Sequence, residues 1–307
     1  MKRRAAPLEQ VWVEVPEGAV EAYEAALAAA CDTVGFFFAD EARGIWRVEG
    51  VREAGAAEGP LAASLLLAAA ASGAEAELRR EPVEAEGWLA RTRAAFPEQL
   101  VGRRFAVQGT HLAAPAAPGR IALRLDAGLA FGSGEHGSTR GCLRALELVA
   151  RGWRPRRVLD LGTGSGILAI AAAKLLGVEV LGTDIDPWAV RVAAENAGAN
   201  GVGRRVRTAQ APGWRGRAAR AGAPYDLVLA NILARPLCRM ARDLASGLAP
   251  GGTAILAGLL DTQAQMVLAA HRRQGLRLGR RLREGSWTTL VVRKGMGGCA
   301  DPPGRHG

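Results

Sequence analysis

The sequence has no apolar run long enough to cross a lipid bilayer. A membrane-spanning helix needs about 18 or more consecutive apolar residues, and the alanine-rich segment Leu61–Ala71 is too short. The N-terminal stretch MKRRAAPLEQ is basic but lacks the apolar core of an export signal. We therefore expect a cytoplasmic protein that does not contact membranes.

Cysteine is scarce, and the pattern of the cysteines excludes two classes of protein. The four cysteines are Cys31, Cys142, Cys238 and Cys299. None forms a CxxC pair and no histidine lies at zinc-finger spacing, so we expect free thiols rather than a disulfide scaffold or a zinc finger. In FGSGEHGSTR (131–140), His136 stands beside Glu135, but this pair without a distant partner does not build a metal site. We expect no bound metal.

Lysine is nearly absent, since only three of the 40 basic residues are lysines. The net charge of +10 is unevenly distributed along the chain. Residues 1–80 hold 8 basic and 13 acidic residues, a net charge of −5, which leaves +15 for residues 81–307. An acidic front part and a basic rear part indicate two modules with different partners, although a solvated asymmetry without function gives the same pattern.

The front part alternates between strand and helix patterns. Strands are predicted at 11–15, 35–40, 44–50 and 74–83, and helices at 17–31 and 58–71. This order is that of a ferredoxin-like α+β unit, which we assign to residues 1–83. Residues 84–112 lose the pattern and are predicted to be a linker that contains a connecting helix and an entry strand.

The rear part, residues 113–295, predicts an α/β domain. Buried strands at 156–161, 178–186, 204–210, 225–233 and 253–260 alternate with helices at 167–177, 188–201, 236–248 and one that ends at Gln274. Asp186 is predicted to cap the second helix, and Asp261 or Thr262 the last. Strands 276–285 and 287–294 leave no room for a helix between them and are expected to pair antiparallel. The prediction is a doubly wound sheet with an antiparallel edge, followed by a disordered tail at 296–307.

A glycine-rich turn follows the first strand of this sheet. In VLDLGTGSGI, Gly162, Gly164 and Gly166 let the backbone approach a ligand closely, and the next helix offers free N–H groups. Asp184 ends the second strand 22 residues after Gly162, where a carboxylate can accept both ribose hydroxyls of a nucleoside. Asn231 ends the fourth strand, at the edge where open sheets bind ligands.

These segments carry a family resemblance. DLGTGSGILAIAAAKLLG, GTDIDPWAVRVAAENAGANGV and VLANILARPL resemble the nucleotide-binding core of class I methyltransferases that use S-adenosylmethionine. With AFGSGEHGSTRGCLRALE upstream and the acidic unit in front, the chain is similar to the PrmA family, the bacterial lysine methyltransferases of large-subunit ribosomal protein eleven. The resemblance runs from Trp88 to Lys294.

The resemblance implies a cofactor site and a substrate. Thr139, Gly162, Asp184 and Asn231 match cofactor residues of the family, and Gly164 lies in the same glycine loop. The segment FGSGEHGST would fold over the methionine end of the cofactor. The roles of Glu135 and His136 stay open. Glu135 is either peripheral or meets an incoming amine. His136 matches a histidine of the family and either makes a direct contact or faces solvent or serves as a cap. TAQAPGW lacks the acid that many methyltransferases use to read adenine, so backbone groups or Gln210 would have to substitute.

The implied reaction is methyl transfer to lysine amines, with the N-terminal amine as a further candidate. The front unit would recognise a basic ribosomal protein, so residues 113–295 alone would bind the cofactor but methylate poorly. No general base or other catalytic residue is identifiable. We expect a monomer. We expect no stable nucleic-acid complex, because Ile232 and Leu233 after Asn231 provide no stacking platform for a flipped base.

Other functions remain to be separated from this one. A nicotinamide-dependent oxidoreductase is disfavoured, because Ile167 stands where the dinucleotide fingerprint needs glycine. A methyltransferase that acts on rRNA or on another protein, and a non-catalytic module for ribosome assembly, are further alternatives.

Overall fold

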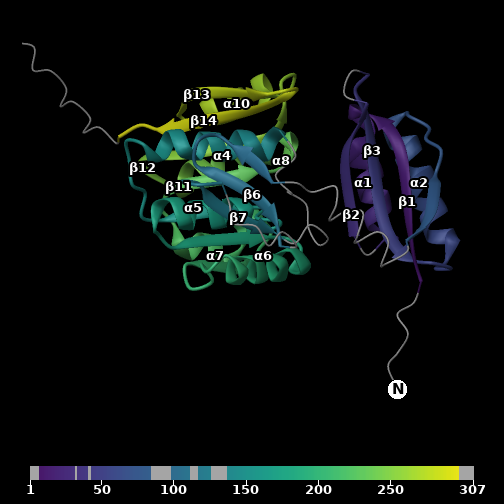
Figure 1. Ribbon diagram of the computed structural model, residues 1–307. Helices are drawn as coiled ribbons and strands as arrows, with labels where there is room; N and C mark the ends of the chain where they lie inside the picture. The colour runs from purple at the N-terminus through teal and green to yellow at the C-terminus, as the bar shows by residue number, and fades with distance from the viewer. Residues whose placement is uncertain are drawn as a thin grey trace, which may run out of the picture. The chain divides into compact units, whose positions relative to one another are not determined.

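The structure is a computed structural model that describes residues 7–31, 33–40, 43–83, 98–110, 117–125 and 137–296. The chain forms two compact units, residues 1–94 and 95–307 (Figure 1). No helix in the described ranges is long and apolar enough to span a membrane. The predicted disordered tail lies outside these ranges except for Met296.

The front unit is a four-stranded sheet with two α-helices. Its elements are, in chain order, β1 (Leu8–Pro16), the short 3-10 helix η1 (Glu17–Ala19), α1 (Val20–Ala28), β2 (Thr33–Asp40), β3 (Ile45–Glu53), α2 (Glu58–Ser72) and β4 (Arg79–Val83). The strands lie in the order β2-β3-β1-β4, and every pair is antiparallel. This is the element order of the ferredoxin-like unit that the sequence predicts.

One face of this sheet forms the core of the front unit. On β1, Val11, Val13 and Val15 are fully buried, as the alternating pattern of a strand with one covered face requires. Tyr23 of α1 is buried as well, and its hydroxyl donates to the carbonyl of Ala74 at 2.7 Å. This bond fastens α1 to the chain that leaves α2.

Helix α2 is apolar on its outer side as well as on its inner side. Residues 60–72 contain no charged side chain. Leu61 and Ala68 are buried, whereas Leu66 and Leu67 are 72% and 71% exposed. These two leucines form an apolar patch that the described residues leave uncovered.

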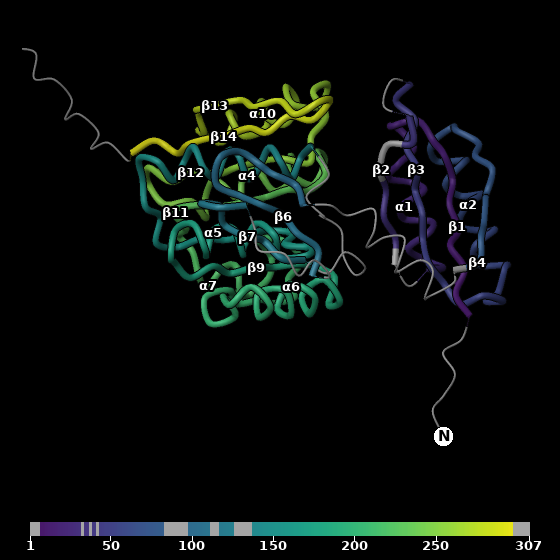
Figure 2. The backbone as a smooth tube through the Cα atoms, viewed as in Figure 1, coloured from purple at the N-terminus to yellow at the C-terminus, as the bar shows by residue number. Residues whose placement is uncertain are grey.

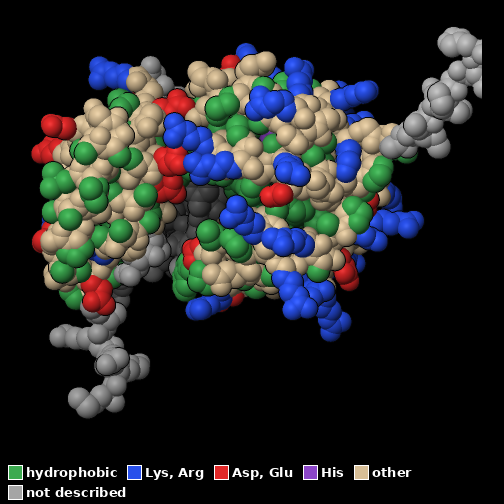
Figure 3. Space-filling view, turned by 180° about the vertical axis from the view of Figure 1, so that it is seen from behind, with side chains coloured by type: hydrophobic (Ala, Val, Ile, Leu, Met, Phe, Trp, Pro, Cys, Tyr) green, Lys and Arg blue, Asp and Glu red, His purple; other side chains and the backbone are tan. Residues whose placement is uncertain are grey.

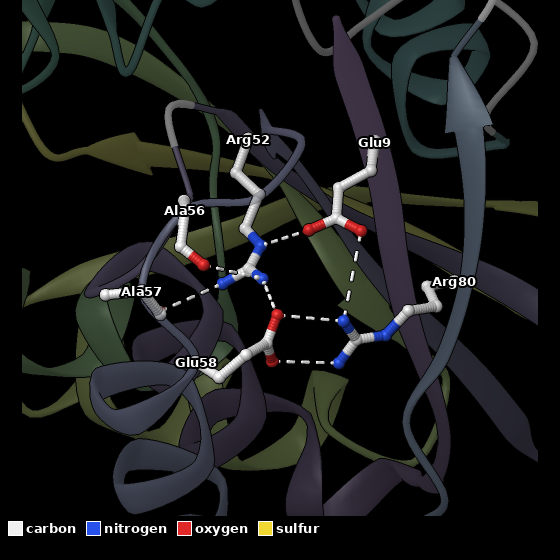
Figure 4. A network of polar contacts seen from close by, with 6 residues as sticks. All are labelled: Glu9, Arg52, Ala56, Ala57, Glu58 and Arg80. Atoms are coloured by element: carbon white, nitrogen blue, oxygen red, sulfur yellow. Dashed lines mark hydrogen bonds and ion pairs between the residues drawn. The ribbon is translucent and has the colours of Figure 1, made fainter.

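A network of four charged side chains ties the strands to the start of α2 (Figure 4). Arg52 of β3 is 2% exposed, and its Nε donates to Glu9 of β1 at 2.7 Å. Arg52 also donates to Glu58 of α2, and Arg80 of β4 donates to the same carboxylate at 2.9 and 3.0 Å. The hydrogen bond from Arg80 and the charge of Arg52 lower the pKa of Glu58 to about 2. The buried guanidinium is therefore neutralised by acids on two elements.

The rear unit is built around a seven-stranded sheet, shown in Figures 1 and 2. Its strands lie in the order β10-β9-β8-β11-β12-β14-β13, and only the two pairs made by β14 are antiparallel. Its elements are, in chain order, α4 (Gly137–Ala150), β8 (Val158–Leu161), α5 (Ile167–Leu176), β9 (Val180–Asp184), α6 (Pro187–Ala199), β10 (Val206–Gln210), the 3-10 helix η2 (Gly213–Arg215), α7 (Arg217–Gly222), β11 (Tyr225–Asn231), α8 (Ala234–Arg239), α9 (Ala241–Gly247), β12 (Leu248–Leu260), α10 (Ala264–Arg272), β13 (Leu276–Glu284) and β14 (Trp287–Lys294). The predicted antiparallel edge is confirmed.

Helices cover both faces of this sheet. One hydrophobic cluster packs the helices α4, α5 and α6 against one face of the sheet. A second cluster packs the four helices α7, α8, α9 and α10 against the other face. The alternation of side chains along a strand explains the division: on β11, Leu227 and Leu229 belong to the first cluster, and Val228 and Ala230 to the second. The three-layer arrangement leaves the ends of the strands free for a site.

A small second sheet belongs to the same unit. It consists of β5 (Gln99–Val101), β6 (Phe105–Gly109) and β7 (Ile121–Leu125), in that order. Phe105 and Val107 are fully buried in the cluster that also holds α4 and α5. Residues 98–110, which the sequence places in the linker, are thus part of the rear unit's folded structure, whereas residues 84–97 lie outside the described ranges.

The helix expected at 236–248 differs in the structure. It is divided into α8 and α9 at Met240, and Leu248 already belongs to β12. The sulfur of Met240 occupies the space that a side chain at Gly213 would need, so this packing contact accompanies the break.

The predicted cap of α10 is wrong. The helix begins at Ala264 without a side-chain cap. Asp261 instead accepts from Thr288 Oγ1 at 2.8 Å and pairs with Arg281 and Arg283 of β13. Because its carboxylate is engaged by the neighbouring strands, it is not available to the helix.

Candidate functional site

The glycine loop connects β8, an inner strand of the sheet, to α5. Gly162, Gly164 and Gly166 have φ angles of 72°, 52° and 81°, in the region that residues with a Cβ avoid. The N–H of Gly162 donates to the carbonyl of Thr183 on β9 at 2.8 Å, which fixes the loop across two strands. A side chain at Gly162 would also collide with Ile232. Glycine is therefore required here both for conformation and for space.

Asp184, at the end of β9, is held by the backbone of this loop. Its Oδ2 accepts from the N–H of Gly164 at 2.9 Å, and its Oδ1 accepts from the N–H of Asp186 at 3.1 Å. Each carboxylate oxygen can accept a further hydrogen bond. Asp186 in turn accepts from Trp188 N at 2.8 Å, which confirms its predicted role as the cap of α6.

Asn231 and Thr139 meet although they are 92 residues apart. Asn231 Nδ2 at the end of β11 donates to Thr139 Oγ1 in the first turn of α4 at 3.2 Å. Thr139 has no exposed surface. Since β11 lies beside β8 in the sheet, the pair adjoins the strand that leads into the glycine loop. The structure thus brings the predicted residues to one end of the sheet.

Asp160 is a residue of this region that the sequence analysis did not select. It lies two residues before Gly162 on β8, and that spacing was the only available signal. It has no exposed surface, and its Oδ2 accepts from Thr163 Oγ1 at 2.7 Å and from Ala169 N at 3.0 Å. Burial, with a smaller contribution from the charge of Asp184, raises the pKa of Asp160 to about 7.

Three buried polar atoms at this end of the sheet have no hydrogen-bond partner within the described part of the chain. They are Oδ1 of Asp160, Oγ1 of Thr183 and Oδ1 of Asn231. Buried polar atoms are nearly always paired, and open α/β sheets bind their ligands at the carboxyl ends of the strands. A polar ligand with N–H or O–H donors would satisfy these atoms.

Other predicted features are only partly visible. Glu135 and His136 lie outside the described residues. Gln210 donates through Nε2 to the carbonyl of Ile185 at 3.1 Å, so its amide is engaged beside Asp184. Over the ranges that the structure describes, no three His, Cys, Asp or Glu side chains are grouped so that they could hold a metal ion.

Asp160 is expected to make stability depend on pH. Its pKa is 3.8 in the reference state and about 7 in the folded chain, so folding favours the protonated form. Its contribution is fully present below about pH 4 and is lost as the pH rises to about 7. From about pH 4 to about pH 7, the free energy of unfolding is expected to fall by on the order of 3 kcal/mol more than in Asp160→Asn. Urea denaturation of both ligand-free proteins measures this difference, and parallel pH profiles would contradict it.

The fold and the site define a class of enzyme. The sheet has one antiparallel strand beside its edge, a glycine loop after β8 and an acid at the end of β9. This is the architecture of class I methyltransferases, as the sequence predicts.

The family follows from comparison with known proteins. Residues 48–295 match the family described as "Ribosomal protein L11 methyltransferase (PrmA)", and the chain belongs to this family. The resemblance predicted from the motifs is therefore confirmed.

Individual relatives agree with this assignment. The chain is 48% identical over 221 residues to "Ribosomal protein L11 methyltransferase" of Rhizobium meliloti (strain 1021), covering 70% of this chain and 76% of that protein. It is 44% identical over 255 residues to the protein of the same name from Sinorhizobium fredii (strain NBRC 101917 / NGR234), covering 83% and 87%. The crystal structure of ribosomal protein L11 methylase from Lactobacillus delbrueckii subsp. bulgaricus is similar with a TM-score of 0.58 and 32% identity, covering 64% of this chain and 98% of that one.

Proposed function

We propose that this chain transfers methyl groups from S-adenosylmethionine to lysine amines of large-subunit ribosomal protein eleven, with the N-terminal amine as a further candidate. The observation that carries the proposal is the family match over residues 48–295, which begins in the front unit and extends through the rear unit. The rear unit holds the candidate cofactor site and is therefore the catalytic unit.

The residues at the carboxyl end of the sheet fit this cofactor. S-adenosylmethionine supplies a methyl group on a positively charged sulfur. Asp184, fixed by the loop, is suited to accept the ribose hydroxyls, and Gly162 and Gly164 allow the backbone to approach the ligand. The unpaired Oδ1 of Asp160 is an acceptor, which suits a ligand that carries an ammonium group and a sulfonium.

Asn231 is the side chain best suited to orient the amine that is methylated. Its Nδ2 is engaged by Thr139, which leaves the buried Oδ1 as an acceptor. An amine that donates one N–H to this oxygen keeps its lone pair free to point at the methyl group, and alignment is the main requirement of the reaction. Only roughly one lysine in a few thousand is neutral at pH 7, and a desolvated site beside a cation raises that fraction.

The front unit is proposed to recognise the protein substrate. Residues 1–80 carry a net charge of −5, which complements a basic ribosomal protein. The exposed Leu66 and Leu67 of α2 add an apolar patch of the kind that marks protein interfaces. The front unit would thus capture the substrate, and the catalytic unit would hold the cofactor.

The experiment that tests the proposal compares substrates directly. Purified ribosomal protein eleven and bare rRNA are each incubated with the chain and S-adenosylmethionine, and products are identified by mass spectrometry. We expect added methyl groups on lysine side chains of the protein and none on the RNA. Calorimetric titration with S-adenosylmethionine and with NAD serves as the cofactor control. Methylated RNA with unmodified protein, or binding of NAD instead, would contradict the proposal.

A further inference from the structure

The segment at one margin of the catalytic unit's sheet is strongly basic. Residues 261–296, which include α10, β13 and β14, contain eight arginines and lysines and only two acids. They therefore carry +6 of the +15 that residues 81–307 hold. In the space-filling view, arginine and lysine side chains outnumber acids over the visible face of this unit (Figure 3).

The two acids of this segment are already engaged. Asp261 pairs with Arg281 and Arg283 of β13, and Glu284 pairs with Arg140 and Arg144 of α4. Their charge is therefore not available to neutralise the other arginines of the two strands.

Three arginines of β13 and β14 remain without an acidic partner among the residues that the structure describes. They are Arg277, Arg280 and Arg293, and all three are exposed. Arg277 lies directly opposite Arg293 in the β13–β14 register. Like charges in such a cross-strand pair repel each other and destabilise a sheet, so folding alone does not favour this arrangement.

The side chain of Arg293 lies against Gly279, a residue of β13 between Arg277 and Arg280. The β13–β14 register shifts between Leu278 and Arg280, so Gly279 lies in a bulge. A Cβ on Gly279 would lie 3.7 Å from both Cδ and Nε of Arg293. Arg293 therefore extends across β13 beside Gly279, at the position that separates Arg277 from Arg280. We call these three residues the arginine cluster.

The cluster also lies on an open margin of the sheet. β13 is the last strand in the order and pairs only with β14 among the described strands. Charged side chains on an edge strand also discourage aggregation. Protection of the edge would be served by single charges, however, and does not require two arginines to face each other.

We propose that the arginine cluster binds the phosphates of RNA in a salt-sensitive contact that does not depend on sequence. Guanidinium groups match the geometry of phosphate oxygens, and a nearby phosphate would relieve the repulsion between Arg277 and Arg293. The choice of RNA rests on the proposed function, because a ribosomal protein is encountered together with rRNA. Such binding needs no stacking platform and no stable, base-specific complex.

A matched pair of variants tests the proposal in the full chain. The first carries Arg277→Gln, Arg280→Gln and Arg293→Gln. The control carries Arg204→Gln, Arg205→Gln and Arg207→Gln at the opposite margin of the sheet, next to and within β10, where these arginines are also exposed. Both variants lose the same charge. The probe is a short fluorescein-labelled RNA hairpin, followed by anisotropy between about 50 and about 200 mM salt.

We expect the unvaried chain and the β10 control to lose affinity steeply with salt. Three phosphate contacts correspond to a loss of roughly 20- to 40-fold over this fourfold salt range, and the cluster variant is expected to lack that part of the dependence and to bind about tenfold or more weakly at low salt. Equal losses in both variants would show a non-local charge effect and overturn the proposal. The proposal would also be overturned if the chain bound vesicles of equimolar phosphatidylcholine and phosphatidylglycerol as tightly as RNA, through the same three residues.

Two further measurements separate this proposal from a structural role and from the proposed function. The melting temperature of the cluster variant is expected to stay the same or rise, because a repulsive pair is removed; a fall would indicate that the arginines stabilise the fold and would count against the proposal. Methylation of the free ribosomal protein is expected to be unchanged in the variant. If the unvaried chain binds RNA as described but methylates no protein, the proposed function fails while the RNA contact stands.

Discussion

Replacing Asp184 by alanine is expected to weaken binding of S-adenosylmethionine by about 1.5–3 kcal/mol, or roughly 10- to 150-fold in Kd. This is the range for hydrogen bonds to a charged group. The carboxylate is held in place by backbone N–H groups of Gly164 and Asp186, so it can accept ribose hydroxyls without being reordered on binding. Isothermal titration calorimetry on the full-length protein measures the change.

The matched control for this variant is Asp186→Ala, two residues further along the chain. Asp186 caps α6 through Trp188 N, and the loss of a cap costs about 1 kcal/mol of stability. This control is therefore expected to lower the melting temperature while it leaves cofactor affinity nearly unchanged. An unchanged Kd in Asp184→Ala, or an equal loss in both variants, would rule out Asp184 as the ribose acceptor.

Removal of the front unit is expected to separate cofactor binding from methylation. The fragment 95–296 retains Thr139, Gly162, Asp184 and Asn231, so we expect it to bind S-adenosylmethionine as the full chain does. Its kcat/KM on the ribosomal protein is expected to fall by about 100-fold or more, because a second binding surface raises the effective concentration of the substrate by that order. Initial-rate kinetics on the fragment and the full chain measure the loss.

The structure changes where this fragment has to begin. A fragment of residues 113–295, as the sequence suggests, would lack β5 and β6 and expose the core that Phe105 and Val107 fill. Circular dichroism must first show that the longer fragment folds. Leu66→Glu and Leu67→Glu in the full chain test the same recognition role without truncation. Their control is Leu100→Glu, at an exposed leucine of the catalytic unit. Full efficiency of the folded fragment would refute the recognition role.

The sequence predicted the central sheet well because its strands are short apolar runs separated by glycine or acidic turns. It could not place β5 and β6, since residues 98–110 lack the period of a regular strand and are defined by packing against α4 and α5. The division of one expected helix at Met240 is accompanied by packing of its side chain against Gly213, which is remote in sequence. Such tertiary contacts override local propensity.

The candidate site was predictable for residues that follow strands, such as Asp184 and Asn231, because spacing alone sets them at the carboxyl end of the sheet. The hydrogen bond between Asn231 and Thr139 was not predictable, since only the docking of α4 brings the two residues together. Asp160 was overlooked because its importance comes from complete burial and an unpaired oxygen. Neither property is visible in the sequence.

The Arg52 network has a consequence for how the front unit responds to heat. The cost of removing charged groups from water falls as temperature rises, because their hydration becomes less favourable, whereas the stabilisation from apolar surface levels off. Arg52, Glu9, Glu58 and Arg80 join β1, β3 and β4 by ionic contacts of this kind. Along α2, in contrast, only Leu61 and Ala68 are buried. On heating, the front unit is therefore expected to loosen first along the later turns of α2, while its strands stay joined.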